Sequence, residues 1–280
     1  MFPLRQLVKN GKRGLTQARS MASGPMVDIK VNDDEVATVT MQRLPVNSLN
    51  LDLLQAMNAT LDDLKKNKAR GMILTSASPT VFSAGLDIME MYKPEAKRLE
   101  LFWRTLQDVW IKLFSSPYPT AAAINGHSPA GGCLLAMSCE YRVMASGKFK
   151  IGLNETALGI VAPAWFQDTM RNTISTRQAE LALTSGRMFS VEEALKIGLI
   201  DEVATDKADV ISKCEKFIAK FENIPPLARS YTKEVFRGEI VNKLVKNKDN
   251  DLKAFLQLVT QPQIQQGLEF YINMLKEKKQ

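Results

Sequence analysis

The sequence is poor in the residues that build metal clusters and disulfide frameworks. Among 280 residues there are three cysteines and one histidine. Three cysteines without CxxC spacing fit neither a disulfide framework nor a zinc site, so we expect Cys133, Cys139 and Cys214 to be reduced thiols. The lone histidine, His127, excludes a multi-histidine metal site. We therefore expect no metal.

Long apolar runs and common nucleotide-binding motifs are also absent. No stretch reaches the roughly 18 to 20 consecutive apolar residues of a membrane-spanning helix, so we expect no membrane span. The sequence contains no G-x-S-x-G, no P-loop and no G-x-G-x-x-G. A hydrophobic content of 45% still allows a substantial buried core in a chain of this length, which predicts a globular protein.

Acidic residues are missing from positions 1–27. Five basic residues lie there, and taking them from the net charge of +7 leaves +2 for the rest of the chain. A basic, acid-free N-terminus with Ser and Thr is typical of a mitochondrial transit peptide, which predicts the mitochondrial matrix. A disordered basic tail is the alternative. Since most of the excess charge lies in this segment, we expect no nucleic-acid partner.

Short β-like runs alternate with helical ones in the first half of the chain. Runs at 26–32 and 35–42 flank a turn and predict a hairpin, and Asn50 is placed to cap a helix over 51–66. The remaining predicted elements are strands at 71–76, 119–126 and 141–146 and helices at 97–115 and 131–140. This alternation predicts an α/β architecture with a mostly parallel sheet, which binds ligands in loops at the carboxyl ends of its strands.

From about Trp165 the pattern becomes almost entirely helical, with a break at 224–226. The last helical stretch, about 250–278, carries a large apolar face and is interrupted by Pro262. Packing on the protein's own core and association between subunits are both open for this face.

Three segments carry the candidate chemistry: FSAGLDI (82–88), INGHSPAGGCLLA (124–136) and IGLNETALGI (151–160). The Ala-Gly of the first allows a ligand to approach the backbone closely. The Gly-Gly of the second opens a helix, whose first N–H groups have no partners within the helix. Together they are able to supply two N–H donors to one oxygen, although each alone is more typical of an ordinary turn.

The third segment has a single ionisable side chain, Glu155, among apolar and small residues. In an apolar pocket the pKa of Glu155 rises toward neutrality, which suits proton transfer. The alternative is an exposed glutamate in the first turn of a short helix capped by Asn154.

In this order and spacing, the three segments resemble the crotonase (enoyl-CoA hydratase/isomerase) superfamily, and within it the mitochondrial enoyl-CoA isomerases. The resemblance runs from about Val27 to the end of the chain. It implies a spiral of β-β-α repeats over 28–222 and a helical C-terminal region, 223–280, that forms a homotrimer. It also implies an acyl-CoA thioester as substrate, with coenzyme A as part of that substrate and no separate cofactor.

The resemblance further implies roles for individual residues. The N–H groups of Ala84 and Gly131 match an oxyanion hole for the thioester oxygen, and Glu155 matches the acid/base. Other residues that match the substrate-binding stretch are Gly85, Leu86, Asp87 and Ile88. Three roles stay open for Asn154: orienting Glu155, lining the acyl pocket, or capping a helix.

Hydratases of this superfamily use two glutamates to activate water, and Leu134 stands where the second would lie. Because leucine cannot hold water, the sequence predicts an isomerase of unsaturated fatty-acid β-oxidation. Glu155 would move the double bond of a cis or trans 3-enoyl-CoA to the trans-2 position by taking a proton from carbon 2 and returning one to carbon 4. The alternatives are another acyl-CoA enzyme, either a hydratase or a thioester hydrolase, and a non-catalytic RNA-binding relative.

Two further groups have weaker links to function. We expect His127 to be structural or to line a loop, since the resemblance implies no acid/base role there. Trp165, Phe166 and Met89 are candidates for the wall around the fatty tail, although core packing is the default for such residues.

Overall fold

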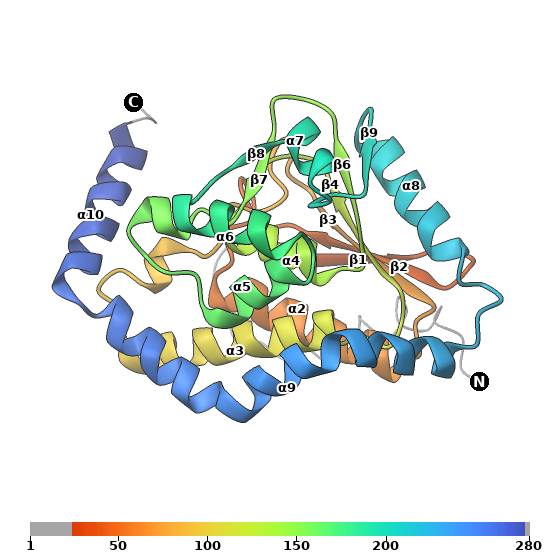
Figure 1. Cartoon of the computed structure of the whole chain (residues 1–280), viewed down its shortest axis with the longest axis horizontal. Helices are drawn as coiled ribbons and strands as arrows, with labels where there is room; N and C mark the ends of the chain where they lie inside the picture. Colours follow the sequence, from red (N-terminus) through yellow and green to blue (C-terminus); the bar gives the residue numbers. More distant parts are fainter. Residues whose placement is uncertain (1–23, 278–280) are drawn as a thin grey trace.

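The computed structural model describes residues 24–277, so positions 1–23 of the predicted transit peptide lie outside the described part. A six-stranded sheet forms the centre of the molecule (Figure 1). Its strands, in spatial order, are β1 (Val27–Val31), β2 (Val36–Met41), β3 (Gly71–Ser76), β4 (Thr120–Ile124), β6 (Tyr141–Ala145) and β9 (Glu202–Ala204). β1 and β2 are antiparallel and every later pair is parallel, which confirms the hairpin and the mostly parallel sheet.

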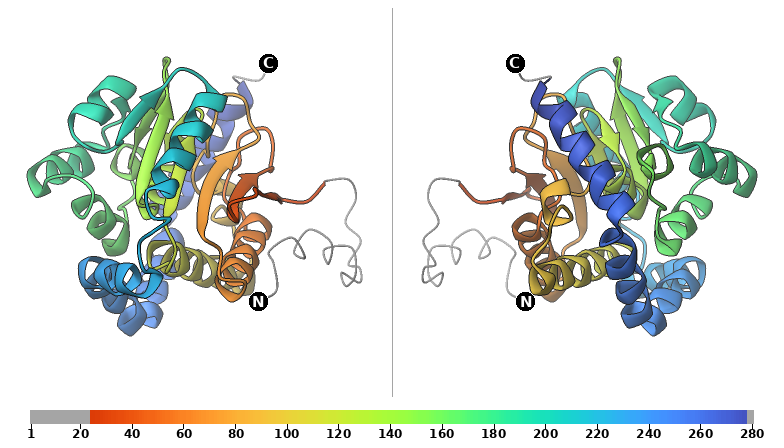
Figure 2. Two further views of the ribbon diagram at one scale, coloured as in Figure 1. Left: turned by 90° about the vertical axis from the view of Figure 1, so that its right-hand side faces the viewer. Right: turned by 90° about the vertical axis from the view of Figure 1, so that its left-hand side faces the viewer.

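Both faces of this sheet are covered by helices (Figure 2). In β4, Ala121 and Ala123 pack with Val210 of α8 (Lys207–Ala219), whereas the intervening Ala122 belongs to the main core. That core includes α2 (Leu51–Lys66), α3 (Ala96–Phe114) and α4 (Gly131–Ser138). Burial on both faces explains why the central strands β3 and β4 are nearly continuous runs of apolar and small residues in the sequence.

A second, three-stranded sheet joins two of the candidate segments. It consists of β5 (Ser128–Pro129), β7 (Lys150–Gly152) and β8 (Phe189–Ser190). Pro129 pairs with Gly152, and the Ala130 N–H donates to the Gly152 carbonyl at 2.8 Å. This pairing ties the turn before α4 to the segment that leads into Glu155.

After Trp165 the chain is almost entirely helical, as predicted, although two short strands, β8 and β9, also follow. Strands of two or three residues are too short to show an alternating pattern. The other elements after this point are helical: α5 (Ala164–Arg171), α6 (Thr176–Ser185), α7 (Val191–Lys196), α9 (Pro226–Val259) and α10 (Pro262–Glu277). Within residues 24–277 no helix has the length and apolar character needed to cross a membrane.

The apolar face predicted over 250–278 is divided between α9 and α10, which meet just before Pro262. α9 runs beneath α3, and α10 stands at the edge of the molecule (Figure 1). Leu252, Val259 and Leu268 of this stretch are buried in the protein's own core. Packing on the core therefore accounts for these residues.

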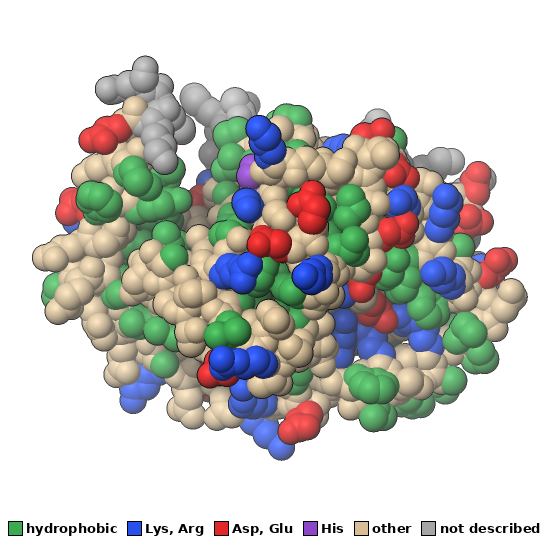
Figure 3. Space-filling model, turned by 45° about the horizontal axis from the view of Figure 1, so that its top comes forward, with side chains coloured by type: hydrophobic (Ala, Val, Ile, Leu, Met, Phe, Trp, Pro, Cys, Tyr) green, Lys and Arg blue, Asp and Glu red, His purple; other side chains and the backbone are tan. Residues whose placement is uncertain are grey.

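On the face of the molecule shown in Figure 3, basic and acidic side chains are interspersed.

Candidate active site

Glu155 lies where β7 gives way to a short 3-10 helix, η2 (Glu155–Leu158). Its side chain is turned inward, and the residue is only 6% exposed. Within the described residues its Oε2 atom has no hydrogen-bond partner. Burial raises the pKa of Glu155 to about 7, against a smaller lowering by its own backbone N–H. The structure therefore confirms that Glu155 is buried rather than exposed. Its raised pKa lies in the range that suits proton transfer near neutral pH.

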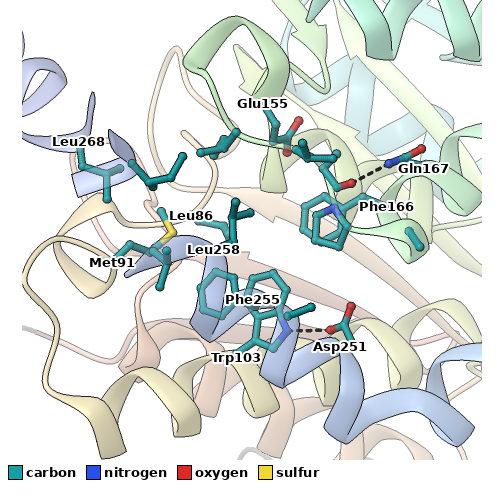
Figure 4. A pocket seen from close by; sticks show the side chains of 18 residues that line it. Leu86, Met91, Trp103, Glu155, Phe166, Gln167, Asp251, Phe255, Leu258 and Leu268 are labelled. Carbon is teal, nitrogen blue, oxygen red and sulfur yellow. Dashed lines mark hydrogen bonds between the residues drawn. The ribbon is translucent and has the colours of Figure 1, made fainter. Parts of the chain in front are cut away.

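A cavity of about 340 Å³ opens beside Glu155 (Figure 4). Leu86 lines it from the first segment, and Phe166 lines it from α5. The other lining residues are Met91, Trp103, Ile160, Val161, Ala162, Pro163, Ala164, Gln167, Asp251, Ala254, Phe255, Leu258, Val259, Ile264 and Leu268. Since most of these side chains are apolar, the cavity suits an aliphatic chain.

Two ionisable side chains line this cavity among the described residues, and their surroundings differ. Asp251 Oδ2 accepts hydrogen bonds from two indoles and one amide: Trp103 Nε1 at 2.7 Å, Gln107 Nε2 at 2.8 Å and Trp165 Nε1 at 3.3 Å. Glu155 Oε2 accepts none. Glu155 therefore has a free carboxyl oxygen with which to take a proton.

The structure contradicts one part of the predicted oxyanion hole. The Ala84 N–H donates to the Val46 carbonyl at 2.9 Å, so it is already committed within the protein. The N–H of Leu86, two residues further along, donates no backbone hydrogen bond within the described residues, although both its neighbours take part in bonds with Leu49. Sequence alone does not show which amide of the Ala-Gly-Leu turn is occupied, because the answer depends on a loop 38 residues earlier in the chain.

Gly131 lies directly against Leu86. A Cβ added to Gly131 would come within 3.3 Å of the Leu86 nitrogen, and one added to Gly85 would lie 3.2 Å from the Gly131 nitrogen. Gly131 is the first residue of α4, where a helix leaves its N–H groups without partners inside the helix. The free donors that the two segments bring together are therefore Leu86 and Gly131, rather than Ala84 and Gly131.

The two turns that present these donors have unusual backbone conformations. Gly85 has a φ of 85°, which glycine adopts without strain. Ala130, the residue before Gly131, has a φ of 48° although it is not a glycine. A residue held in such a conformation stores strain, and such strain gathers at functional sites. The bond from the Ala130 N–H to Gly152 helps to hold it there.

The other predicted binding residues have mixed environments. Asp87 forms an ion pair with Arg43 at 2.6 Å and accepts from the Met89 N–H, so its carboxylate is used within the protein. Ile88 is half-buried against the core at the start of η1 (Ile88–Glu90). Asn154 makes no side-chain cap to η2, and its Oδ1 has no partner within residues 24–277, which removes the capping role.

Three further predictions about side chains have clear outcomes. His127 Nδ1 accepts from the Lys150 N–H at 3.2 Å, and its ring lies edge-on to Phe149, as a structural role requires. Phe166 lines the cavity, whereas Trp165 lies within the aromatic core beside Trp103. Met89 is 64% exposed and is not among the lining residues, so its proposed place in the wall was wrong.

Sequence reasoning missed the part of the cavity that comes from distant helices. Trp103 belongs to α3, whereas Asp251 and Phe255 belong to α9 and Ile264 to α10. For Trp103, Phe255 and Ile264 the signal is the apolar period of each helix, which marks a buried face without saying what it faces, and for Asp251 there is no such signal. Among the described residues there is no group of three or more His, Cys, Asp or Glu that could hold a metal ion.

Comparisons with known proteins agree with this geometry. A family model described as enoyl-CoA hydratase/isomerase matches residues 32–280. A rat protein named enoyl-CoA delta isomerase 1, mitochondrial, is 41% identical over 272 residues, which cover 96% of this chain and 94% of the relative. The human protein of the same name is 42% identical over 246 residues, covering 87% of this chain and 81% of the relative.

The fold also matches solved structures. The crystal structure of human mitochondrial delta3-delta2-enoyl-CoA isomerase superposes with a TM-score of 0.88 at 40% identity, and the match covers 91% of this chain and all of the other. An enoyl-CoA hydratase from Mycobacterium ulcerans gives a TM-score of 0.76 at 27% identity, covering 83% of this chain and all of that one. These matches confirm the predicted crotonase-like α/β fold.

Proposed function

The chain belongs to the enoyl-CoA hydratase/isomerase family, and on that premise we propose that it is a Δ3,Δ2-enoyl-CoA isomerase of unsaturated fatty-acid β-oxidation. The observation that carries the proposal is Glu155, a buried carboxyl group with a free oxygen beside an apolar cavity. The relatives of highest identity named above are isomerases of this kind.

Glu155 serves as both base and acid. In its ionised form it takes a proton from carbon 2 of the 3-enoyl-CoA, and the electron pair spreads over a dienolate that ends on the thioester oxygen. The protonated Glu155 then returns a proton to carbon 4, which leaves the double bond at the trans-2 position. A pKa of about 7 suits both steps, because neither form of the carboxyl group is strongly disfavoured at neutral pH.

The N–H groups of Leu86 and Gly131 stabilise the negative charge on the thioester oxygen. They are fixed before substrate arrives, and the amino end of α4 adds the positive end of its dipole at Gly131. Loss of one such preorganised donor costs about 2.7 to 4 kcal/mol of transition-state stabilisation. The two donors and the glutamate together account for the reaction without a separate cofactor, which is our proposal for this chain.

Hydration is disfavoured because the second carboxylate is replaced. Leu134 is fully buried in α4 and offers no group that could position a water molecule. A single acid/base is sufficient to move a proton between two carbons on one face of a bent substrate. The same site therefore favours isomerisation over addition of water.

We also propose that the protein is a homotrimer in the mitochondrial matrix. Leu227, Tyr231 and Val235 recur every four residues on α9, and each is at least 60% exposed in the single chain. An apolar stripe of this kind is typical of a surface that another subunit covers. Sedimentation equilibrium tests the assembly, and a monomeric mass would contradict it.

Two observations support the proposed location in the mitochondrial matrix. They are the acid-free N-terminus and the word mitochondrial in the relatives' names.

Product analysis tests the activity directly. Purified protein is incubated with cis- and trans-3-hexenoyl-CoA, and separately with trans-2-hexenoyl-CoA, and the products are separated by chromatography. We expect trans-2-hexenoyl-CoA from the first two substrates. Accumulation of 3-hydroxyhexanoyl-CoA would instead identify a hydratase, and release of free coenzyme A would identify a thioester hydrolase.

A backbone substitution separates the corrected oxyanion hole from the predicted one. Replacing the amide nitrogen of residue 86 with an ester oxygen removes one N–H and leaves every side chain in place. We expect the turnover number to fall about 10²- to 10³-fold. The same replacement at residue 84 removes the bond to Val46 and should lower stability more than turnover. The opposite pattern would restore Ala84 to the oxyanion hole.

A further inference from the structure

The side of the cavity opposite Glu155 is closed by two stacked aromatic rings (Figure 4). Phe255 of α9 lies parallel to Trp103 of α3, with ring centroids 3.6 Å apart and an angle of 7° between the planes. Both residues line the cavity, and Phe255 is only partly buried. We refer to this pair as the Phe255–Trp103 stack.

Trp103 is fixed in place from behind. It is 1% exposed, and its indole N–H donates to Asp251 Oδ2 at 2.7 Å. The same oxygen holds the Trp165 indole at 3.3 Å, and Trp165 lies edge-on to Trp103 with centroids 6.0 Å apart. Because Trp103 cannot retreat into this packed core, the ring of Phe255 has a rigid support and cannot move away from the cavity in that direction.

Another part of the cavity wall is formed by side chains without rings. Met91, Leu258, Ile264 and Leu268 come from the loop before α3, the end of α9 and α10. Met91 is unbranched and flexible, and the other three side chains are smaller than the two rings, which are stacked on each other and supported by a hydrogen-bonded indole. An alkyl chain that starts between Leu86 and Glu155 therefore meets its firmest obstacle at the Phe255–Trp103 stack.

We propose that Phe255, supported by Trp103, sets the longest acyl chain that the site accepts. The inference rests on the proposed function, since it takes the cavity as the acyl pocket. Each methylene that enters an apolar pocket contributes about 0.8 kcal/mol, which corresponds to about fourfold in affinity. This gain continues as the chain lengthens and stops at the length at which the tail reaches the ring of Phe255.

The test measures binding rather than turnover. Saturated acyl-CoA thioesters with even chains from four to fourteen carbons are titrated calorimetrically into wild-type protein, Phe255→Ala and Phe255→Trp. In the wild type we expect about fourfold tighter binding per methylene up to a limiting length. In Phe255→Ala the gain should continue beyond that length, and in Phe255→Trp it should stop at a shorter chain.

Phe270→Ala is the matched control, because Phe270 lies on the neighbouring α10 but is 72% exposed and does not line the cavity. Its limiting length should equal that of the wild type. A limiting length that is the same in all four proteins would overturn the inference. Phe255→Trp keeps an aromatic ring on α9, so it still reports if truncation to alanine disturbs folding.

Failure of this inference and failure of the proposed function give different experimental results. If the protein bound the thioesters with the expected dependence on chain length but produced no trans-2-enoyl-CoA, the isomerase proposal would fail and the inference about Phe255 would stand. If it isomerised short substrates normally but the Phe255 variants left the limit unchanged, only the inference would fail.

Discussion

Glu155 is buried and Glu140 is half-buried, and these two glutamates differ in what surrounds them. Glu155 has a carboxyl oxygen without a hydrogen-bond partner in the described part of the chain, and burial raises its pKa to about 7. Glu140, at the turn between α4 and β6, forms ion pairs with Arg229 and Lys233 of α9. Burial pushes the pKa of Glu140 up, but the charge of Lys233 and the hydrogen bond from Arg229 outweigh it and leave the pKa below its ordinary value.

The difference shows that partners, more than burial, decide the role of a carboxyl group. At Glu140 the cations hold α9 against the core, and neighbouring Arg237 donates to the carbonyls of Phe114 and Ser138 at the ends of α3 and α4. Glu140 is therefore part of the structure that positions α9. Among residues 24–277 Glu155 has no such cationic partner, and buried groups with raised pKa values of this kind are typical of active sites.

The largest expected effect is on activity, in Glu155→Gln. This change keeps the shape of the side chain and removes its basicity, so we expect the turnover number for 3-hexenoyl-CoA to fall about 10²- to 10⁴-fold. Glu140→Gln should retain the turnover of wild type per folded molecule. Near-normal turnover in Glu155→Gln would show that another group moves the proton.

The next effect is on stability, in Glu140→Gln. Removing this charge leaves Arg229 and Lys233, both less than 10% exposed, without their acidic partner. Breaking a buried ion pair from one side costs about 3 to 5 kcal/mol of unfolding free energy. Urea unfolding measures the loss, and Glu180→Gln is the control because its pair with Arg177 is exposed. Equal stability of the two variants would contradict the structural role of Glu140.

A smaller effect concerns the pH dependence of stability. The pKa of Glu155 is higher in the folded protein than in the unfolded chain, so the folded state binds more protons between about 4.5 and 7. Ionisation of Glu155 therefore lowers wild-type stability as the pH rises through this window. The loss reaches about 3 kcal/mol above pH 7.

A comparison of the wild type with Glu155→Gln isolates the contribution of Glu155 to the pH dependence of stability. The variant should match the wild type near pH 4.5 and become the more stable protein as the pH approaches 8. Glu140 has the opposite effect on stability, because its pKa is lowered in the folded protein. Its ionisation stabilises the protein above the pKa of the unfolded chain, and this stabilisation is lost as the pH falls through the pKa of the folded state. A difference between wild type and Glu155→Gln that does not change with pH would contradict a raised pKa for Glu155.

Much of this account could be predicted from local sequence patterns. The hairpin and the helices over 51–66 and 97–115 depend on residues close together in the chain, whereas the role of Glu155 depended on a family resemblance carried by three segments between residues 82 and 160. The occupied amide of Ala84 and the free amide of Leu86 could not be predicted, because they depend on Val46 and Leu49 in a separate loop. The Phe255–Trp103 stack was equally hidden, since its two rings come from helices about 150 residues apart.

The most direct test of the central claim is the pH dependence of kcat/KM for 3-hexenoyl-CoA, which reports ionisation in the free enzyme. Glu155 must be ionised to take the first proton, so kcat/KM should rise with pH and level off above an apparent pKa of about 7. A profile that is already flat from pH 5.5 to 8 would contradict the account, because the base would then be an ordinary carboxylate.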